Sequence, residues 1–308
     1  MDKEMIYKSR SFLSCFNAAY KLIGDNFMKI IRRLWLPILV ISICNGIFTL
    51  AQAYSLNSLT SDANNPVVIF VLYAISIVGL LVGSIWMTAR LMALLNEYSV
   101  KKNLINVTFT FLNNLVICLV IFALVALCLY AIYRHSNVNA QVFLINNWLV
   151  LFFIFILICV VMLPFIYINM RYINKEGASF WKDLPSSYAT GFKNIGTLLI
   201  TALLLGMILF VIYSIAGMPL FILNTARTTS LLGEMMGDPS DLPHNFTMLM
   251  VCTSVLTSLF VCLVGLFPTI VCFLLYGSIE KQREENRMVI KTVEPTNEVQ
   301  DLPSFNLE

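Results

Sequence analysis

Six long apolar stretches in the chain contain no Asp, Glu, Lys or Arg. They cover residues 34–54, 67–87, 115–133, 148–170, 195–217 and 247–276. A helix needs about 20 apolar residues to cross the hydrocarbon core of a bilayer, and each stretch has about that length or more. The pattern therefore predicts an all-α, polytopic membrane protein with six transmembrane helices.

The segment before the first stretch has a different pattern. Its large apolar residues recur every three or four positions: Phe12, Phe16, Tyr20, Ile23, Phe27 and Ile30. Charged residues occupy the other faces, which is typical of an amphipathic helix lying along a membrane surface. We therefore expect a cytoplasmic surface helix at 1–33, a six-helix transmembrane domain at 34–279, and a charged helix end with a disordered tail at 280–308.

The basic residues alternate between the segments that connect the stretches. From the N-terminus onward these segments hold 7, 0, 3, 1, 4, 1 and 4 Lys and Arg, so alternate segments place 18 of the 20 on one side. Basic segments beside helix ends are retained in the cytoplasm. The count predicts that both the N-terminus and the C-terminus are cytoplasmic.

Composition agrees with a membrane protein. Apolar residues make up 59% of the chain and charged residues 12%, whereas soluble domains have roughly 45–50% and 25%. The net charge of +3 is small, and the basic residues beside helix ends read as orientation signals and headgroup contacts. We expect no nucleic-acid partner.

A short pattern occurs three times and predicts an internal repeat. It consists of Ser, then Phe or Val, then thirteen residues, then Asn and an apolar residue, and its copies begin at Ser11, Ser99 and Ser179. Each copy precedes an outward-going span. The pattern favours three units of surface helix plus transmembrane hairpin, although Ser and Asn are also common where helices begin.

The stretch from Pro164 to Tyr188 holds an inward span with a proline, an acidic-Gly turn at Glu176 and Gly177, and a surface helix that begins near Ser179. In this layout the chain resembles bacterial six-span proteins similar to the membrane domain attached to some glycerophosphodiester phosphodiesterases. The resemblance implies a bacterial cytoplasmic (inner) membrane protein with an envelope or lipid-related role. The chain has no catalytic phosphodiesterase domain, so we expect no enzymatic activity.

Candidate chemistry is sparse. The fifth connecting segment holds four ligand-type residues at helical spacing: Glu234, Asp238, Asp241 and His244. Gly237 and two prolines interrupt that helix, so a solvated acidic loop is favoured over a cation site. The spans carry no titrating acid or base for ion-coupled transport, and we expect neither a cofactor nor a metal.

Other small and polar residues in the spans suggest packing. Gly79 and Gly83 form a small-residue face that favours close helix contact within the bundle. Asn45, Gln52 and Asn169 would supply polar contacts to a substrate, or hydrogen bonds between helices.

The densest basic cluster consists of Lys29, Arg32 and Arg33, directly before the first span. These residues are our candidates for contact with lipid headgroups, the alternative being ordinary topology anchoring. The sequence favours a non-enzymatic component that binds membrane lipids or supports another envelope component, with membrane lipids or another membrane protein as its partners. The alternative hypothesis is a transporter or permease-like subunit for an uncharged or lipidic substrate.

Overall fold

The computed structural model describes residues 8–57, 65–136, 148–175, 177, 179–238 and 242–293. These residues form helices, without a strand: α2 (Phe12–Asn57), α3 (Pro66–Leu95), α4 (Val100–Ser136), α6 (Trp148–Met162), α7 (Pro164–Asn174), α8 (Phe180–Lys193), α9 (Ile195–Met235) and α10 (Phe246–Val293). Six helical segments are long and apolar enough to cross a membrane, with α6 and α7 together forming the fourth. The prediction of an all-α, multi-pass membrane protein is confirmed.

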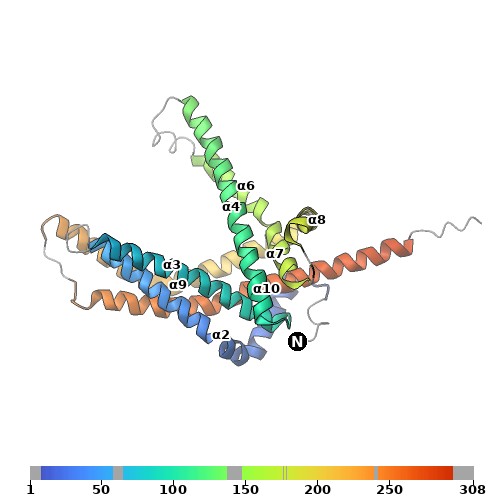
Figure 1. The fold of residues 1–308 in the computed structure, drawn as a ribbon, viewed down its shortest axis with the longest axis horizontal. Coiled ribbons are helices and arrows are strands. Elements are labelled where there is room, and N and C mark those ends of the chain that lie inside the picture. Colours follow the sequence, from blue (N-terminus) through green and yellow to red (C-terminus); the bar gives the residue numbers. More distant parts are fainter. Residues whose placement is uncertain are drawn as a thin grey trace, which may run out of the picture.

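Four helices, α2, α3, α9 and α10, lie side by side in an elongated bundle (Figure 1). The central helices are α2 and α10, and half of the most apolar stretch of α2 is buried. The core contains Leu34 and Ile38 from α2, Met92 from α3, and Ile270 and Leu274 from α10. Because lipid tails are as apolar as these side chains, close packing is what holds the helices together in a membrane.

The two ends of this bundle differ in charge. At one end α2 finishes, α3 starts, α9 finishes and α10 starts (Figure 1), and the segments there hold few basic residues. At the other end α3 finishes at Leu95 and α9 starts at Ile195, beside the basic segments. We call this second end the basic end.

The remaining membrane-crossing helices project away from the bundle. Figure 1 shows α4 and α6 leaving it at a steep angle. None of the most apolar stretch of α4 is buried, and α6 has no buried residue. Their exposed side chains are mostly Leu, Val, Ile and Phe, as expected for surfaces that lie against acyl chains.

Glycines allow α3 and α10 to approach α2 closely. A Cβ at Gly83 would lie 2.7 Å from Ile41, and one at Gly79 would clash with Cys44. On the opposite side, a Cβ at Gly46 would lie 2.7 Å from Val255 of α10. The small-residue face on α3 is therefore used for packing within the chain, as expected from the sequence.

The amphipathic N-terminal segment is the start of α2, which continues without a break past residue 33. Its fully buried residues are Cys15 and Ala19, and Phe16 packs edge-on against Phe267 of α10 with ring centroids 5.9 Å apart. Tyr20 and Phe27 are 78% and 48% exposed. Only part of the apolar face expected from the sequence packs on the protein, and Tyr20 and Phe27 stay on the surface.

Pro37 leaves a carbonyl in α2 without its helical partner, because proline has no backbone N–H to donate to Arg33 four residues earlier. Nη1 of Arg90, on α3, donates instead to the Arg33 carbonyl oxygen at 2.8 Å. The same guanidinium lies 4.7 Å from the ring of Trp86. The proline in α2 is thus coupled to a specific side chain of α3.

Helix α8 is docked on the proline that separates α6 from α7. The hydroxyl of Tyr188 donates to the carbonyl of Val161 at 3.2 Å, and the rings of Tyr188 and Phe165 are 5.8 Å apart. A Cβ at Gly191 would lie 3.0 Å from Pro164. The junction of α6, α7 and α8 is therefore held by direct contacts.

The three serines of the predicted repeat all precede a helix. The Oγ atoms of Ser11 and Ser99 accept backbone N–H groups three residues on, at 3.4 and 3.3 Å, as N-caps do. The Ser179 side chain makes no such bond. Helix capping accounts for two copies of the pattern, and the repeat itself stays a prediction.

The charged segment after the last apolar stretch continues α10 to Val293. Ion pairs one turn apart stabilise this extension, with Lys281 Nζ 3.7 Å from Glu284 and Arg283 Nη1 3.9 Å from Glu280. The charged helix end expected at the start of 280–308 is therefore present. The tail at 294–308 lies outside the described residues.

Candidate functional site

A groove of about 300 Å³ lies between α2 and α3 at the basic end. Its lining residues are Leu22, Asn26, Lys29 and Ile30 from α2, and Leu91, Leu94 and Leu95 from α3. We call this cavity the α2/α3 groove. Five of the seven side chains are aliphatic. The groove is therefore an apolar slot whose polar groups are the side-chain amide of Asn26 and the amine of Lys29.

The two helices form the groove because they pack on residues beside it. Leu91 and Leu95 are almost fully buried and Ile30 is 5% exposed, so these three side chains fix the walls. Asn26 donates its side-chain N–H to the Leu22 carbonyl at 3.2 Å, which holds the amide along α2. The polar groups of the groove thus lie on α2, and α3 supplies aliphatic side chains.

Of the three basic residues expected to contact headgroups, Lys29 lines the groove. Arg32 and Arg33 are exposed on α2 within about one turn of Lys29, but they are not among the lining residues. None of the three makes an ion pair with another residue in the described part of the chain. Three positive charges are therefore available near the mouth of an apolar slot.

Sequence reasoning missed the α3 side of the groove. Arg90 lies one residue before Leu91 and adds a fourth cation close to the groove, where it bonds the Arg33 carbonyl. Leu91, Leu94 and Leu95 follow the predicted second span, and no local pattern set them apart from other span residues. The spacing of Leu91 and Leu95 at one helical turn, beside a basic residue, is the signal that the sequence offered.

Asn45, near the middle of the first apolar stretch, is used for helix packing. The side chain of Asn45 donates to the Ser254 Oγ at 3.1 Å, and the Thr49 hydroxyl donates to the same oxygen at 2.7 Å. Gln52 is exposed, and the Asn169 Oδ1 is buried without a hydrogen-bond partner. Asn45 therefore joins α2 to α10, one of the two uses that the sequence left open for it.

A second polar contact holds the connection between α3 and α4. The side chain of Asn96 donates to the Oδ1 atoms of Asn103 and Asn174, at 2.9 and 3.1 Å, and Asn103 donates back to Asn96 at 3.0 Å. Asn103 is fully buried. This amide cluster links α3, α4 and α7, and its bonds are satisfied internally, so it reads as a structural element.

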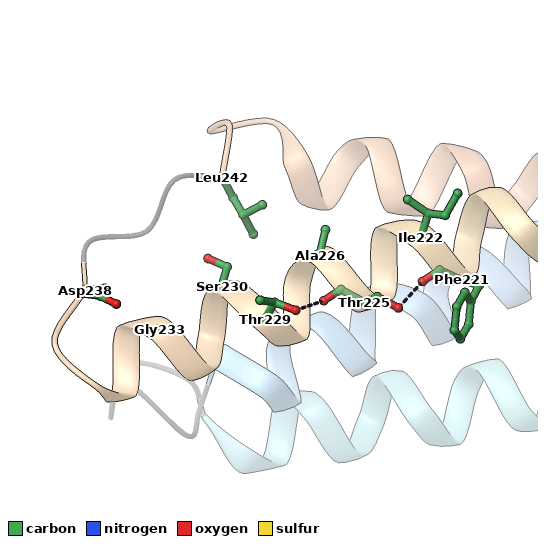
Figure 2. Close-up of a pocket in the computed structure, with 9 residues that line it drawn as sticks. All are labelled: Phe221, Ile222, Thr225, Ala226, Thr229, Ser230, Gly233, Asp238 and Leu242. Carbon is green, nitrogen blue, oxygen red and sulfur yellow. Dashed lines mark hydrogen bonds between the residues drawn. The ribbon is translucent and has the colours of Figure 1, made fainter.

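A larger cavity of about 630 Å³ lies at the other end of the bundle, beside the end of α9 (Figure 2). Figure 2 shows that the hydroxyl groups of Thr225 and Thr229 bond carbonyls of their own helix, at 2.9 and 3.0 Å. Asp238 is the charged residue in its lining, and its backbone N–H caps α9 by bonding to the Gly233 carbonyl at 3.0 Å. This cavity offers a ligand little free polar chemistry.

The acidic loop near this cavity starts where the sequence predicted a helix break. Gly237 has φ +95 and follows the last turn of α9, and its N–H bonds to the Glu234 carbonyl at 3.1 Å, as in a Schellman C-cap. Asp241 lies outside the described residues. Over the part of the chain that the structure describes, no group of three His, Cys, Asp or Glu side chains is placed to hold a metal ion.

Compared with known proteins, the chain matches no family model, no curated protein and no solved structure. The α2/α3 groove and the charges around it are the features of this chain that bear on its function.

Proposed function

We propose that this protein is a non-enzymatic lipid-binding component of a bacterial inner membrane, and that the α2/α3 groove holds an anionic lipid. The observation that carries the proposal is the combination of an aliphatic slot with the Lys29 amine in its lining. A lipid needs both parts, because its acyl chain favours aliphatic walls and its phosphate favours a cation.

The charges around the groove support binding at a membrane surface. Arg32 and Arg33 are exposed and carry no ion pair within the described residues, and Lys29 is also exposed. A basic residue near an anionic leaflet is worth about 1 kcal/mol of attraction. The exposed rings of Tyr20 and Phe27, on the same helix, match the aromatic residues that anchor proteins at headgroup level.

The orientation that we propose places the basic end in the cytoplasm. The alternation of basic segments supports it, since 18 of the 20 Lys and Arg fall in alternate segments that include the two segments flanking the groove. The groove then faces the inner leaflet. The proposed relation to the membrane domain of glycerophosphodiester phosphodiesterases fits this lipid-related role.

Transport of a substrate through the bundle has less support. Asn45 is bonded to Ser254, and the helices that it joins, α2 and α10, are the most buried of the bundle. A transport site is expected to bring free polar groups together at mid-depth. We therefore favour lipid binding over the permease-like alternative.

Native mass spectrometry of the purified full chain tests the proposal. We expect phosphatidylglycerol to remain bound to the natural protein, and to bind about tenfold more weakly when Lys29→Gln, Arg32→Gln and Arg33→Gln are combined. Lys21→Gln is the matched control, because Lys21 is exposed on the same helix and does not line the groove. If the triple variant retains as much phosphatidylglycerol as the natural protein, these three cations have no role in binding. If Lys21→Gln also loses the lipid, the attraction is non-specific.

A second variant tests the apolar part of the site. Leu94→Trp places a larger side chain in the lining of the groove, so it should reduce lipid retention while leaving all four cations in place. If the triple variant loses lipid and Leu94→Trp does not, headgroup attraction alone is responsible and the groove is not the binding site.

A further inference from the structure

Arg171 is a buried cation with an incomplete set of partners. It lies in the last turn of α7 and is 7% exposed. Its Nη1 donates to the Ser187 Oγ of α8 at 2.8 Å, while its Nε is buried and has no hydrogen-bond partner. Arginine stays protonated in proteins, so this site holds a full positive charge whose one side-chain partner among the described residues is a neutral hydroxyl.

Leaving such a charge unpaired is costly. Buried charges in proteins are normally paired and hydrogen-bonded, because removing an ion from water costs several kcal/mol. Arg171 makes no ion pair with any described residue. A negative group supplied from outside the chain would compensate the charge.

The start of α8 contributes further donors at the same place. A small cavity is lined by Arg171, Ser179 and Ser187, among others. Ser179 is exposed at the start of α8, and its side chain makes no capping bond. The Ser187 Oγ accepts the bond from Arg171, which leaves its own hydrogen free to be donated. A helix N-terminus also carries a partial positive charge.

Asp183 is the negative group in the lining of this cavity. Its Oδ2 accepts the backbone N–H of Ser179 at 3.1 Å, so that oxygen is engaged at the start of α8. The carboxylate opposes the entry of a highly charged anion.

The size of the cavity sets how much of a ligand enters. Its free volume of about 10 Å³ is roughly the space that one water molecule needs. One oxygen atom of a larger anion has about the size that fits inside, so the rest of the anion would stay outside the cavity.

From these observations we propose that Arg171, Ser187 and Ser179 form a phosphate-binding site at the junction of α7 and α8. One phosphate oxygen enters the cavity and accepts hydrogen bonds from the Arg171 Nε and the two serine hydroxyls. The phosphate belongs either to a lipid headgroup, since α7 ends a membrane-crossing segment, or to free inorganic phosphate. The inference does not depend on the α2/α3 groove.

The test uses the purified full chain in neutral detergent with two probes. Phosphatidylglycerol binding is titrated by native mass spectrometry, and inorganic phosphate is titrated by thermal unfolding against chloride at equal ionic strength. We expect saturable binding of at least one probe. Phosphatidylglycerol alone would identify a lipid phosphate, and inorganic phosphate stabilising the fold would identify a free one.

Three variants locate the site. Arg171→Gln should weaken binding roughly tenfold to a hundredfold, the range for losing a hydrogen bond to a charged group, and Ser187→Ala should weaken it less. Ser187→Ala also serves as the informative variant if Arg171→Gln does not fold, which circular dichroism and gel filtration would show. Lys182→Gln, an exposed cation in the first turn of α8, should bind as the natural protein does.

The inference is overturned if the natural protein binds neither probe saturably, or if folded Arg171→Gln and Ser187→Ala bind both probes with unchanged affinity. It is also overturned if Lys182→Gln weakens probe binding as much as Arg171→Gln does, because the loss of affinity would then reflect general attraction to a basic surface. Lys29→Gln separates the two sites, since it should weaken lipid binding at the groove and leave the effect of Arg171→Gln intact.

Discussion

The contact between Arg90 and the Arg33 carbonyl gives a sharp test of how α2 and α3 are joined. Arg90→Met keeps most of the aliphatic stem but removes the donor and the charge. The lost hydrogen bond, 2.8 Å long, is worth about 1.5–3 kcal/mol for a charged donor. The contact with Trp86 at 4.7 Å adds about 0.5–1 kcal/mol at an exposed site. We expect the free energy of unfolding to fall by about 2–3 kcal/mol, because water reaches the partly exposed carbonyl in the variant.

The role of Pro37 is tested by a double-mutant cycle. In Pro37→Ala the new backbone N–H can bond to the Arg33 carbonyl, so Arg90 is no longer its main donor. Arg90→Met should then cost only the contact with Trp86, about 0.5–1 kcal/mol. The expected coupling energy between positions 37 and 90 is about 1–2 kcal/mol.

Reversible unfolding in mixed micelles, followed by helicity, measures all four proteins of the cycle. The reasoning is refuted if Arg90→Met costs the same in both backgrounds, because the bond would then be unrelated to the proline. If Arg90→Met changes the free energy of unfolding by almost nothing in the Pro37→Ala variant, the contact with the Trp86 ring contributes nothing.

Two further predictions concern packing within the bundle. Gly83→Leu adds a side chain where a Cβ would already lie 2.7 Å from an atom of α2. We therefore expect the free energy of unfolding, measured by thermal unfolding in detergent, to fall by about 1–3 kcal/mol. Gly206→Leu is the control, since nothing lies within 4 Å of a Cβ there, and an equal loss in it would contradict the packing argument. Ser254→Ala removes the oxygen that accepts hydrogen bonds from Asn45 and Thr49. In the same assay we expect the free energy of unfolding to fall by about 1 kcal/mol. An unchanged unfolding temperature would show that these bonds are replaced within the bundle.

The sequence was a good guide to the spans, because the length of an uncharged apolar run is a direct physical requirement for crossing a bilayer. It was a poorer guide to which residues pack. At the start of α2 the hydrophobic pattern included Ile30, which is buried, and Tyr20 and Phe27, which are exposed, but it did not include the fully buried Cys15 and Ala19. Small side chains let helices approach closely, so a pattern weighted by hydrophobicity finds the lipid-facing side as readily as the packed side.

The candidate sites show the same limit. Lys29 was identifiable as part of a basic cluster, but the groove exists only because α3 places Leu91 and Leu94 opposite it. Arg171 entered the sequence argument only as one more cation on the basic side. Its burial and its contact with Ser187 depend on how α8 packs against α7, which a count of charges does not contain.

Topology and binding use the same basic residues, so the lipid-binding experiment has to separate them. Of the 20 Lys and Arg, 18 are in the alternate connecting segments that the count predicts to be cytoplasmic, and 2 are in the other segments. Neutralising Lys29, Arg32 and Arg33 leaves 15 against 2, a bias that still fixes the orientation of the chain. The triple variant should therefore insert as the natural protein does, and accessibility labelling of a cysteine introduced into each connecting segment would verify this. A loss of lipid in a correctly oriented protein then reflects the site, whereas an inverted protein would show that these three cations act as the topology signal.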